Sequence, residues 1–271
     1  MKKILTFALF LFLSIALHSQ QLYLNPDAGW AFQAFPSKVE SFINVKNDNN
    51  NTSIQSPEFS MGGGLLANLS VGYFFNDYLG IDFGLQMHFG SKVTFTQETV
   101  ILNQLEEKEI ILKGRRVIII PSMILKAGSG FLVPYLKLGP SFGFIKQERH
   151  IVAKIDTNTG EEFWSYSGPP AIGINAVAGL MANIKENMAV SLSLTCSGMV
   201  YRPTKSDRYK KLENKYPLPP GRPYEEHIVF VDWTDDPYNT GPQDPEEPTL
   251  MQGQNFAYSN VGINLGVFFF F

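Results

Sequence analysis

The chain has 271 residues, with 22 Lys and Arg against 25 Asp and Glu, a formal net charge of −3 at pH 7 and a mean hydropathy of −0.04. This acidic balance argues against a nucleic-acid partner, and a single cysteine, Cys196, excludes a framework of intrachain disulfides. Beyond the first 20 residues no stretch contains 18 consecutive apolar residues, so no membrane-spanning helix is expected there.

The first 20 residues have the pattern of a secretory signal peptide. Lys2 and Lys3 form a positive start, and residues 4–17 are an apolar run that is too short to cross a bilayer as a helix. We expect cleavage after Ser19 or Gln20, with an uncleaved anchor helix as the alternative. The mature chain is then a single domain, 21–271, with 20 basic and 25 acidic residues once Lys2 and Lys3 are removed.

Several segments of the mature chain alternate between apolar and small or polar residues, most clearly 79–89, 132–144, 188–197 and 260–271. Successive side chains of a β-strand point to opposite faces, so each segment has one apolar face and one small, polar face. A soluble β-sandwich also alternates. However, runs of about ten residues with Gly, Ala and Ser on the second face favour a transmembrane barrel with its apolar face outward.

Turn signals divide the mature chain into eight predicted strands. They lie at 22–35, 61–75, from 79, 115–127, from 131, 171–184, from 188 and from about 254. Short turns at 76–78, 128–130 and 185–187 alternate with long connections. This order predicts an all-β fold, an eight-stranded antiparallel up-and-down transmembrane barrel with short periplasmic turns, long extracellular loops and both termini periplasmic. Counting the outer hairpins as further crossings would give ten strands, but their tips carry too many charges.

The connections on the extracellular side are expected to carry the individual function. The hairpins around 102–109 and 150–164 are expected to project beyond the membrane and to leave strand edges open for β-augmentation. The segment 202–253 is expected to be a long loop, with nine of the 17 prolines and an acidic second half. We expect it to dock a protein partner through Tyr224, Trp233, Asp235 and Asp236, while a solvated acidic lid is the alternative. Residues 227–233 alternate and are compatible with an extra strand.

A second group of candidate residues faces the predicted barrel interior: Asp27, Asn68, Asp82, Gln86, His88, Lys92, Lys126, Tyr135, Lys137, Asn175, Asn183 and Asn264. Buried charges are costly unless they are paired, so we expect Asp27 and Asp82 to pair with Lys126 or Lys137. Eight strands enclose just enough space for their own side chains, which favours a structural plug over an ion path. We expect no metal site, because His88 has no second His or Cys at ligand spacing.

The segments LSVGYFFNDYLGIDFGLQ, VPYLKLGPSFGF and INAVAGLMANIKENMAVSLSL resemble the small outer-membrane β-barrel family of Gram-negative bacteria, the OmpA/OmpX-type barrels and the related PorT-like group. The resemblance covers the whole mature chain, without the cell-wall-binding domain of the two-domain members. It implies outer-membrane lipid and the barrel assembly machinery as partners. It also implies that Gly266, Phe269 and Phe271 form an assembly signal in the last strand. The same aromatic residues would belong to the periplasmic aromatic girdle.

Motifs typical of enzymes, such as Gly-x-Ser-x-Gly, a phosphate loop or His-Glu-x-x-His, do not occur. We therefore expect a non-enzymatic interaction or accessory barrel without a cofactor, which docks a partner through its extracellular loops. The alternative is a narrow, porin-like transport barrel for small or hydrophobic solutes. A lipid-modifying enzyme is a third hypothesis, for which His150 and His227 would be recruited.

Overall fold

The structure is a computed structural model that describes residues 21–38, 44–48, 51–55, 58–101, 104–155, 158–213, 225–231 and 249–271. Every regular element in these ranges is a β-strand. Within them, no helix is long and apolar enough to cross a membrane.

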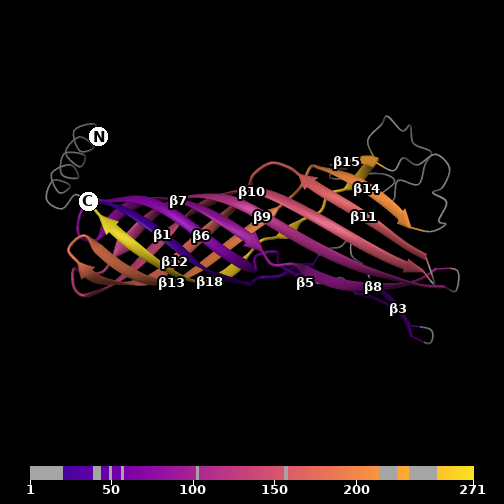
Figure 1. Ribbon diagram of the computed structural model, residues 1–271, viewed down its shortest axis with the longest axis horizontal. Helices are drawn as coiled ribbons and strands as arrows, with labels where there is room; N and C mark the ends of the chain where they lie inside the picture. Colours follow the sequence, from indigo (N-terminus) through magenta and orange to yellow (C-terminus); the bar gives the residue numbers. More distant parts are fainter. Residues whose placement is uncertain are drawn as a thin grey trace, which may run out of the picture.

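Eight strands form a closed antiparallel barrel (Figure 1). In order around the barrel they are β1 (Gln21–Gln33), β6 (Gly64–Phe74), β7 (Leu79–Gly90), β9 (Gln104–Lys126), β10 (Leu132–Ile155), β12 (Ala171–Lys185), β13 (Met188–Tyr201) and β18 (Asn260–Phe270). The first strand closes on the last, from Tyr23 opposite Phe270 to Gln33 opposite Asn260. The predicted eight-stranded antiparallel barrel is therefore confirmed.

The outer wall of the barrel is apolar. The outward positions of β13 and β18 hold residues such as Leu192, Leu194, Ile263 and Leu265, which are 47–63% exposed. On the neighbouring strands the same face carries Val117 and Phe144. From these two residues to the turns at the opposite end, the outward positions of the described barrel strands carry no charged side chain. The strict alternation of the sequence thus becomes an uncharged apolar belt around the barrel.

Three tight turns lie at one end of the barrel, which we call the turn end, and the chain terminus at Phe271 lies there too (Figure 1). They connect β6 to β7, β9 to β10 and β12 to β13, at the positions predicted from the sequence. In the first turn the Asn76 side-chain oxygen accepts hydrogen bonds from the backbone N–H groups of Tyr78 (2.9 Å) and Leu79 (2.8 Å). Asparagine stabilises such turns by replacing a backbone acceptor. In the second turn Gly128 has a φ of 86°, which favours glycine.

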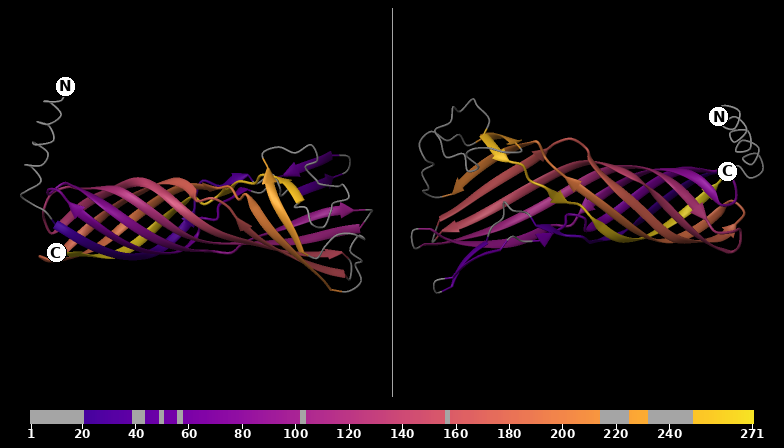
Figure 2. Two further views of the ribbon diagram at one scale, coloured as in Figure 1. Left: turned by 90° about the horizontal axis from the view of Figure 1, so that it is seen from above. Right: turned by 180° about the vertical axis from the view of Figure 1, so that it is seen from behind.

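At the opposite end, β9 and β10 continue past the barrel as part of an extended sheet (Figures 1 and 2). Its strand order is β8, β9, β10, β11, β14, β15, β16, and only β15 and β16 pair in parallel. The added strands are β8 (Val93–Ile101), β11 (Asn158–Ser167), β14 (Lys205–Glu213), β15 (Glu225–Val231) and β16 (Thr249–Gln252). The prediction of a loop over 202–253 is therefore wrong for β14, all of which pairs with β11, whereas β15 coincides with most of the extra strand considered at 227–233.

Short strands complete the described chain. They are β2 (Ser37–Lys38), β3 (Asn44–Asp48), β4 (Asn51–Gln55), β5 (Glu58–Phe59) and β17 (Phe256–Ala257). Strand β17 pairs with β13 just before β18 begins. Strands β3 and β4 form a separate hairpin beside β8.

One seam in the barrel wall is interrupted. The pairing of β9 with β10 stops after Leu138 opposite Met123 and resumes at Phe142 opposite Ile119 in the same register. This register places Pro121 and Pro140 directly opposite each other, and neither has a backbone N–H to donate. Both prolines still pair on their other sides, Pro121 with Phe83 of β7 and Pro140 with Ile174 of β12.

Candidate functional site

The barrel interior is filled in layers, and the layer nearest the turn end is apolar. It consists of Tyr23, Phe74, Ile124, Val133, Tyr135, Met181, Ala189 and Phe268, all buried. The rings of Tyr23 and Phe74 lie 5.2 Å apart, and the Phe268 ring packs at 5.2 Å from Tyr23 and 5.5 Å from Tyr135. Rings at these distances are in direct contact, so this layer is a packed apolar core inside the barrel.

A polar layer follows, with Lys137 at its centre. The Lys137 ammonium lies 3.0 Å from the Asp82 carboxylate, and it donates further hydrogen bonds to Asn25 (3.3 Å) and Ser70 (3.2 Å). The Tyr23 hydroxyl donates to the same Asp82 oxygen at 2.6 Å. Both charged groups are therefore buried but paired, as burial of charge requires. The space that remains is about 40 Å³, enough for a few water molecules and no more.

The structure brings together only part of the predicted interior cluster. Asp82 pairs with Lys137 as expected, while Asp27 accepts a hydrogen bond from Asn68 on the neighbouring strand β6. Lys126 lies apart from both, because it is near the end of β9, with its ammonium 4.3 Å from the centre of the Phe74 ring. It lines an open vestibule of about 680 Å³ at the turn end. The expectation that Lys126 belongs to the cluster is thus wrong.

The remaining residues predicted to face the barrel interior do so with one exception, Lys92. Gln86, His88, Tyr135, Asn175 and Asn264 are all buried, as predicted from the alternation. Asn183, near the turn end, donates a hydrogen bond to the Gly130 carbonyl at 2.5 Å. Lys92 is instead exposed, because the strand phase changes at 90–92. Phe89 lies opposite Arg115 but Val93 lies opposite Leu112, so one extra residue shifts the register and reverses the face.

A second apolar cluster fills the space where the barrel meets the extended sheet. It includes Met61, Trp164, Tyr166, Met199, Phe230, Phe256 and Tyr258. Arg116 is buried beside it, with its guanidinium donating to the Tyr258 carbonyl at 2.5 Å. The sequence did not reveal this cluster, because Trp164, Tyr166 and Phe230 come from β11 and β15, outside the predicted barrel strands.

The inner face of the extended sheet also carries a stacked group that the sequence did not reveal. The Arg149 guanidinium lies 3.8 Å from the centre of the Trp164 ring, and that of Arg208 lies 5.1 Å from it. Arg149 is only 6% exposed, and burial lowers the pKa of its guanidinium. Burial also raises the pKa of Tyr166 to about 12. Cation–π contact offsets part of the cost of burying the two arginines.

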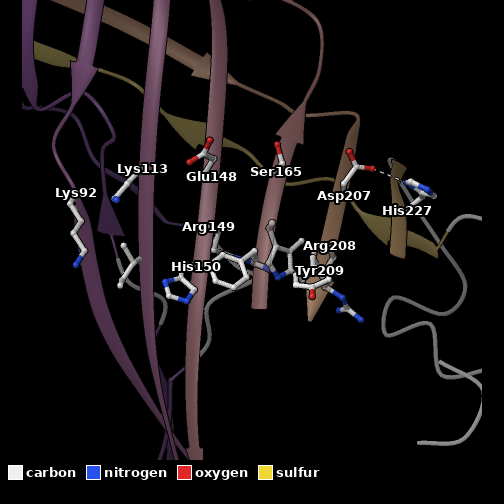
Figure 3. A pocket seen from close by; sticks show the side chains of 13 residues that line it. Lys92, Lys113, Glu148, Arg149, His150, Ser165, Asp207, Arg208, Tyr209 and His227 are labelled. Carbon is white, nitrogen blue, oxygen red and sulfur yellow. Dashed lines mark hydrogen bonds and ion pairs between the residues drawn. The ribbon is translucent and has the colours of Figure 1, made fainter. Parts of the chain in front are cut away.

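The extended sheet holds a cavity of about 730 Å³, lined by outward residues and also by Arg149, Trp164 and Arg208 (Figure 3). Glu148, Ser165, Asp207 and His227 form a row across β10, β11, β14 and β15. The next row includes His150, Phe163 and Tyr209, with the His150 ring stacked on Phe163 at 4.3 Å. Phe163 and Tyr209 are 40% and 46% exposed. Exposed aromatic rings beside charged groups are typical of a binding surface.

Ser165, Asp207 and His227 are of the residue types found in hydrolytic triads, but their order in space differs. The His227 ring nitrogen lies 2.8 Å from Asp207, and Asp207 lies between His227 and Ser165 in the register. A triad requires the imidazole to reach the serine hydroxyl. The arrangement therefore does not activate Ser165 as a nucleophile.

The remaining predicted residues lie at the turn end or outside the described ranges. Gly266 faces inward beside Asp27, while Phe269 and Phe271 face outward with 38% and 74% exposure. Their place at the turn end is compatible with an aromatic girdle, and their role in assembly stays a prediction. The predicted partner residues Tyr224, Trp233, Asp235 and Asp236 lie outside the described residues.

Comparison with known proteins gives a fold-level similarity only. No protein-family model and no curated protein matches the sequence. Among solved structures, the chain is similar to Neisserial surface protein A (12% identity, 92% of this chain and 96% of that chain covered, TM-score 0.32). It is also similar to Ail, the attachment invasion locus protein of Yersinia pestis (12% identity, 94% and 100% covered, TM-score 0.31). A major outer membrane protein from Thermus thermophilus has 11% identity, 94% and 100% coverage and a TM-score of 0.43. At identities and TM-scores this low, the function has to be argued from the chain itself.

Proposed function

We propose that the mature chain is an integral outer-membrane β-barrel that acts as a non-enzymatic interaction protein. The observation that carries this proposal is the uncharged apolar belt, which surrounds the whole barrel. A soluble protein rarely exposes a contiguous apolar surface larger than a few hundred Å². A closed barrel also leaves no open strand edge in its wall, as the bilayer interior demands. Membership of the OmpA/OmpX-type or PorT-like group is part of the proposal.

The orientation follows from the two different ends. Outer-membrane barrels have short turns on the periplasmic side and longer connections outside. We therefore place the turn end, with both termini of the mature chain, in the periplasm and the extended sheet outside the cell. In this orientation the 730 Å³ cavity with Phe163, Tyr209 and His227 faces the extracellular space.

The filled interior supports an interaction role over transport. An apolar layer with Tyr23, Phe74 and Phe268 fully buried is followed by a polar layer with about 40 Å³ of free space. We expect no steady single-channel conductance when the protein is reconstituted in a planar bilayer. Reproducible conductance steps would instead support the narrow transport barrel.

The extended sheet supports docking of a protein partner. Strands β8 and β16 are the edges of this sheet in the described residues, and an open edge can accept a further strand. The cavity over the strands between these edges offers aromatic and charged side chains together. Binding through this surface requires no contribution from the barrel interior.

Site-specific photocrosslinking on intact cells tests the partner. A photoreactive phenylalanine analogue replaces Tyr209, which is 46% exposed in the cavity, or Tyr78, which is 62% exposed in a turn at the other end. We expect a discrete protein adduct from position 209 and none of the same mass from position 78. Recovery of the bare barrel from both positions, with folded protein in the membrane, would refute docking at the sheet.

A further inference from the structure

A row of basic residues lies where the apolar belt ends and the extended sheet begins. Arg115 on β9 lies directly opposite Lys146 on β10. Lys205 on β14 lies opposite Ser167, the residue that follows Tyr166, and Tyr166 lies opposite Gln147. All three side chains are exposed on the outward face. We call Arg115, Lys146 and Lys205 the rim row.

The rim row lies directly next to the last row of the apolar belt, on the side of the extended sheet. Phe89 of β7 lies opposite Arg115 in the same row and is 47% exposed. In the next outward row towards the turn end, Val117 lies opposite Phe144. Residues two apart on one strand are about 7 Å apart. The positive charges therefore begin immediately where the apolar side chains stop.

The rim row itself contains no acidic residue, because Ser167 is the residue between Lys146 and Lys205. Arg115 and Lys146 are like charges on directly opposed positions, which destabilises a sheet. Lys146 has an ion pair with Glu148 at 3.3 Å, but the two side chains are 71% and 56% exposed. An ion pair with that exposure contributes little. The next row outward carries both signs, because Glu148 lies opposite Lys113 and Asp207 lies opposite Ser165, so the excess of positive charge is confined to the rim row.

The row occupies one side of the rim only. On the other barrel strands, the last outward positions towards the extended sheet are uncharged, at Phe32, Leu65, Ile172, Val200 and Val261. A general preference for basic residues at the membrane boundary would distribute them around the barrel. The concentration on β9, β10 and β14 instead indicates one binding position.

We propose that the rim row binds the headgroup of a phosphate-bearing lipid of the surrounding leaflet, whose acyl chains lie along the belt below it. Arginine and lysine are the side chains that bind phosphate. Lys146 and Lys205 are two strands apart, about 10 Å, so the row spans a headgroup with more than one phosphate. The lipid supplies the negative charge between Arg115 and Lys146 and covers Val117 and Phe144. The proposal rests on the membrane location proposed above.

Reconstitution in nanodiscs tests the proposal directly. The full mature chain is placed in phosphatidylcholine nanodiscs with a small fraction of diphosphoryl lipid A, and retained lipid A is measured by native mass spectrometry. We expect wild-type protein to retain lipid A selectively. The variant Arg115→Gln/Lys146→Gln should bind it about 30-fold more weakly, which corresponds to about 1 kcal/mol for each charge near an anionic surface.

The matched control is Lys108→Gln/Lys154→Gln, which removes the same charge from the same two strands. Lys154 lies eight residues beyond Lys146, about 27 Å further along β10. We expect this control to retain lipid A like the wild type. If both variants lost lipid A equally, the overall charge of the protein would explain the binding and the proposal would be overturned. Unchanged retention of lipid A by the rim-row variant would also overturn it. Failure of the wild type to enter nanodiscs at all would instead refute the membrane location.

Discussion

The ion pair between Lys137 and Asp82 offers the sharpest test of the interior. Asp82 is only 6% exposed in the wild-type structure. Lys137→Met therefore leaves a buried carboxylate whose remaining partner in the polar layer is the Tyr23 hydroxyl. Asp82→Asn leaves the ammonium with Asn25 and Ser70 and with the rings of Tyr23 and Phe268, at 5.7 Å and 5.3 Å. The double variant leaves neither charge.

The expected magnitudes follow from these partners. Removing one member of a buried ion pair costs about 3–5 kcal/mol, because the other charge stays buried and unpaired. Lys137→Met should lie at the upper end of this range. Asp82→Asn should lie near the lower end, because cation–π contacts worth up to about 2 kcal/mol remain for Lys137. The double variant should lose less than the sum of the two single losses by at least about 2 kcal/mol.

Urea unfolding of the reconstituted barrel measures these losses. The outward-facing Trp30 is 50% exposed at the barrel wall, so its fluorescence reports on transfer from lipid to water. Circular dichroism at the same urea concentrations checks that the transition is a single one. Additive losses, or single variants within about 0.5 kcal/mol of the wild type, would refute a paired charge at the centre of the interior.

Three further predictions test the wall and the turn end. Gly72→Ala places a Cβ against Cζ of the Tyr23 ring and should lower the free energy of unfolding by about 1–3 kcal/mol. Gly84→Ala, where the nearest atom is 3.6 Å away, should change it little, and equal losses of the two variants in urea unfolding would contradict this packing. Cys196 faces outward in the belt, so a water-soluble maleimide should label it in unfolded protein but not in reconstituted vesicles, and rapid labelling in vesicles would contradict its burial in lipid. Phe271→Ser should lower the amount of folded barrel in the outer membrane, whereas Phe131→Ser, which is equally exposed at 74%, should not; unchanged levels would remove Phe271 from the assembly signal.

The barrel itself could be predicted from the sequence because all its strands share one residue pattern. The outward residues are apolar and the inward residues are mostly small or polar, so the period-two alternation continues along each strand. The run from Ile81 to Phe89 illustrates this, with every second residue exposed. Asn76 and Gly128 mark turns by local chemistry alone, and for this reason their positions were also predictable.

The extended sheet could be predicted only in part. The projecting hairpins and the alternation at 227–233 indicated some of its strands, but β14 has no such pattern. The sequence KSDRYKKLE of β14 has a single aliphatic residue, Leu212, and it forms a strand by pairing with β11. Strand propensity depends strongly on such neighbours. The exposure of Lys92 had a similar cause, since a one-residue bulge at 90–92 leaves no mark in the composition. The prediction of paired interior charges was right for Asp82 and Lys137 and wrong for Lys126. Alternation shows which face of the strand a residue occupies, but not its position along the barrel axis.

The facing prolines Pro121 and Pro140 have a consequence for motion. A barrel wall resists separation through the row of hydrogen bonds between each pair of strands, and the β9–β10 row is interrupted at mid-height. Backbone amides open first where such bonds are few. Hydrogen exchange along this seam should therefore be faster than along β13–β18, whose pairing is continuous from Met188 to Ser197. Thermal fluctuations of the barrel should accordingly be concentrated on the side that carries the long β9–β10 hairpin of the extended sheet.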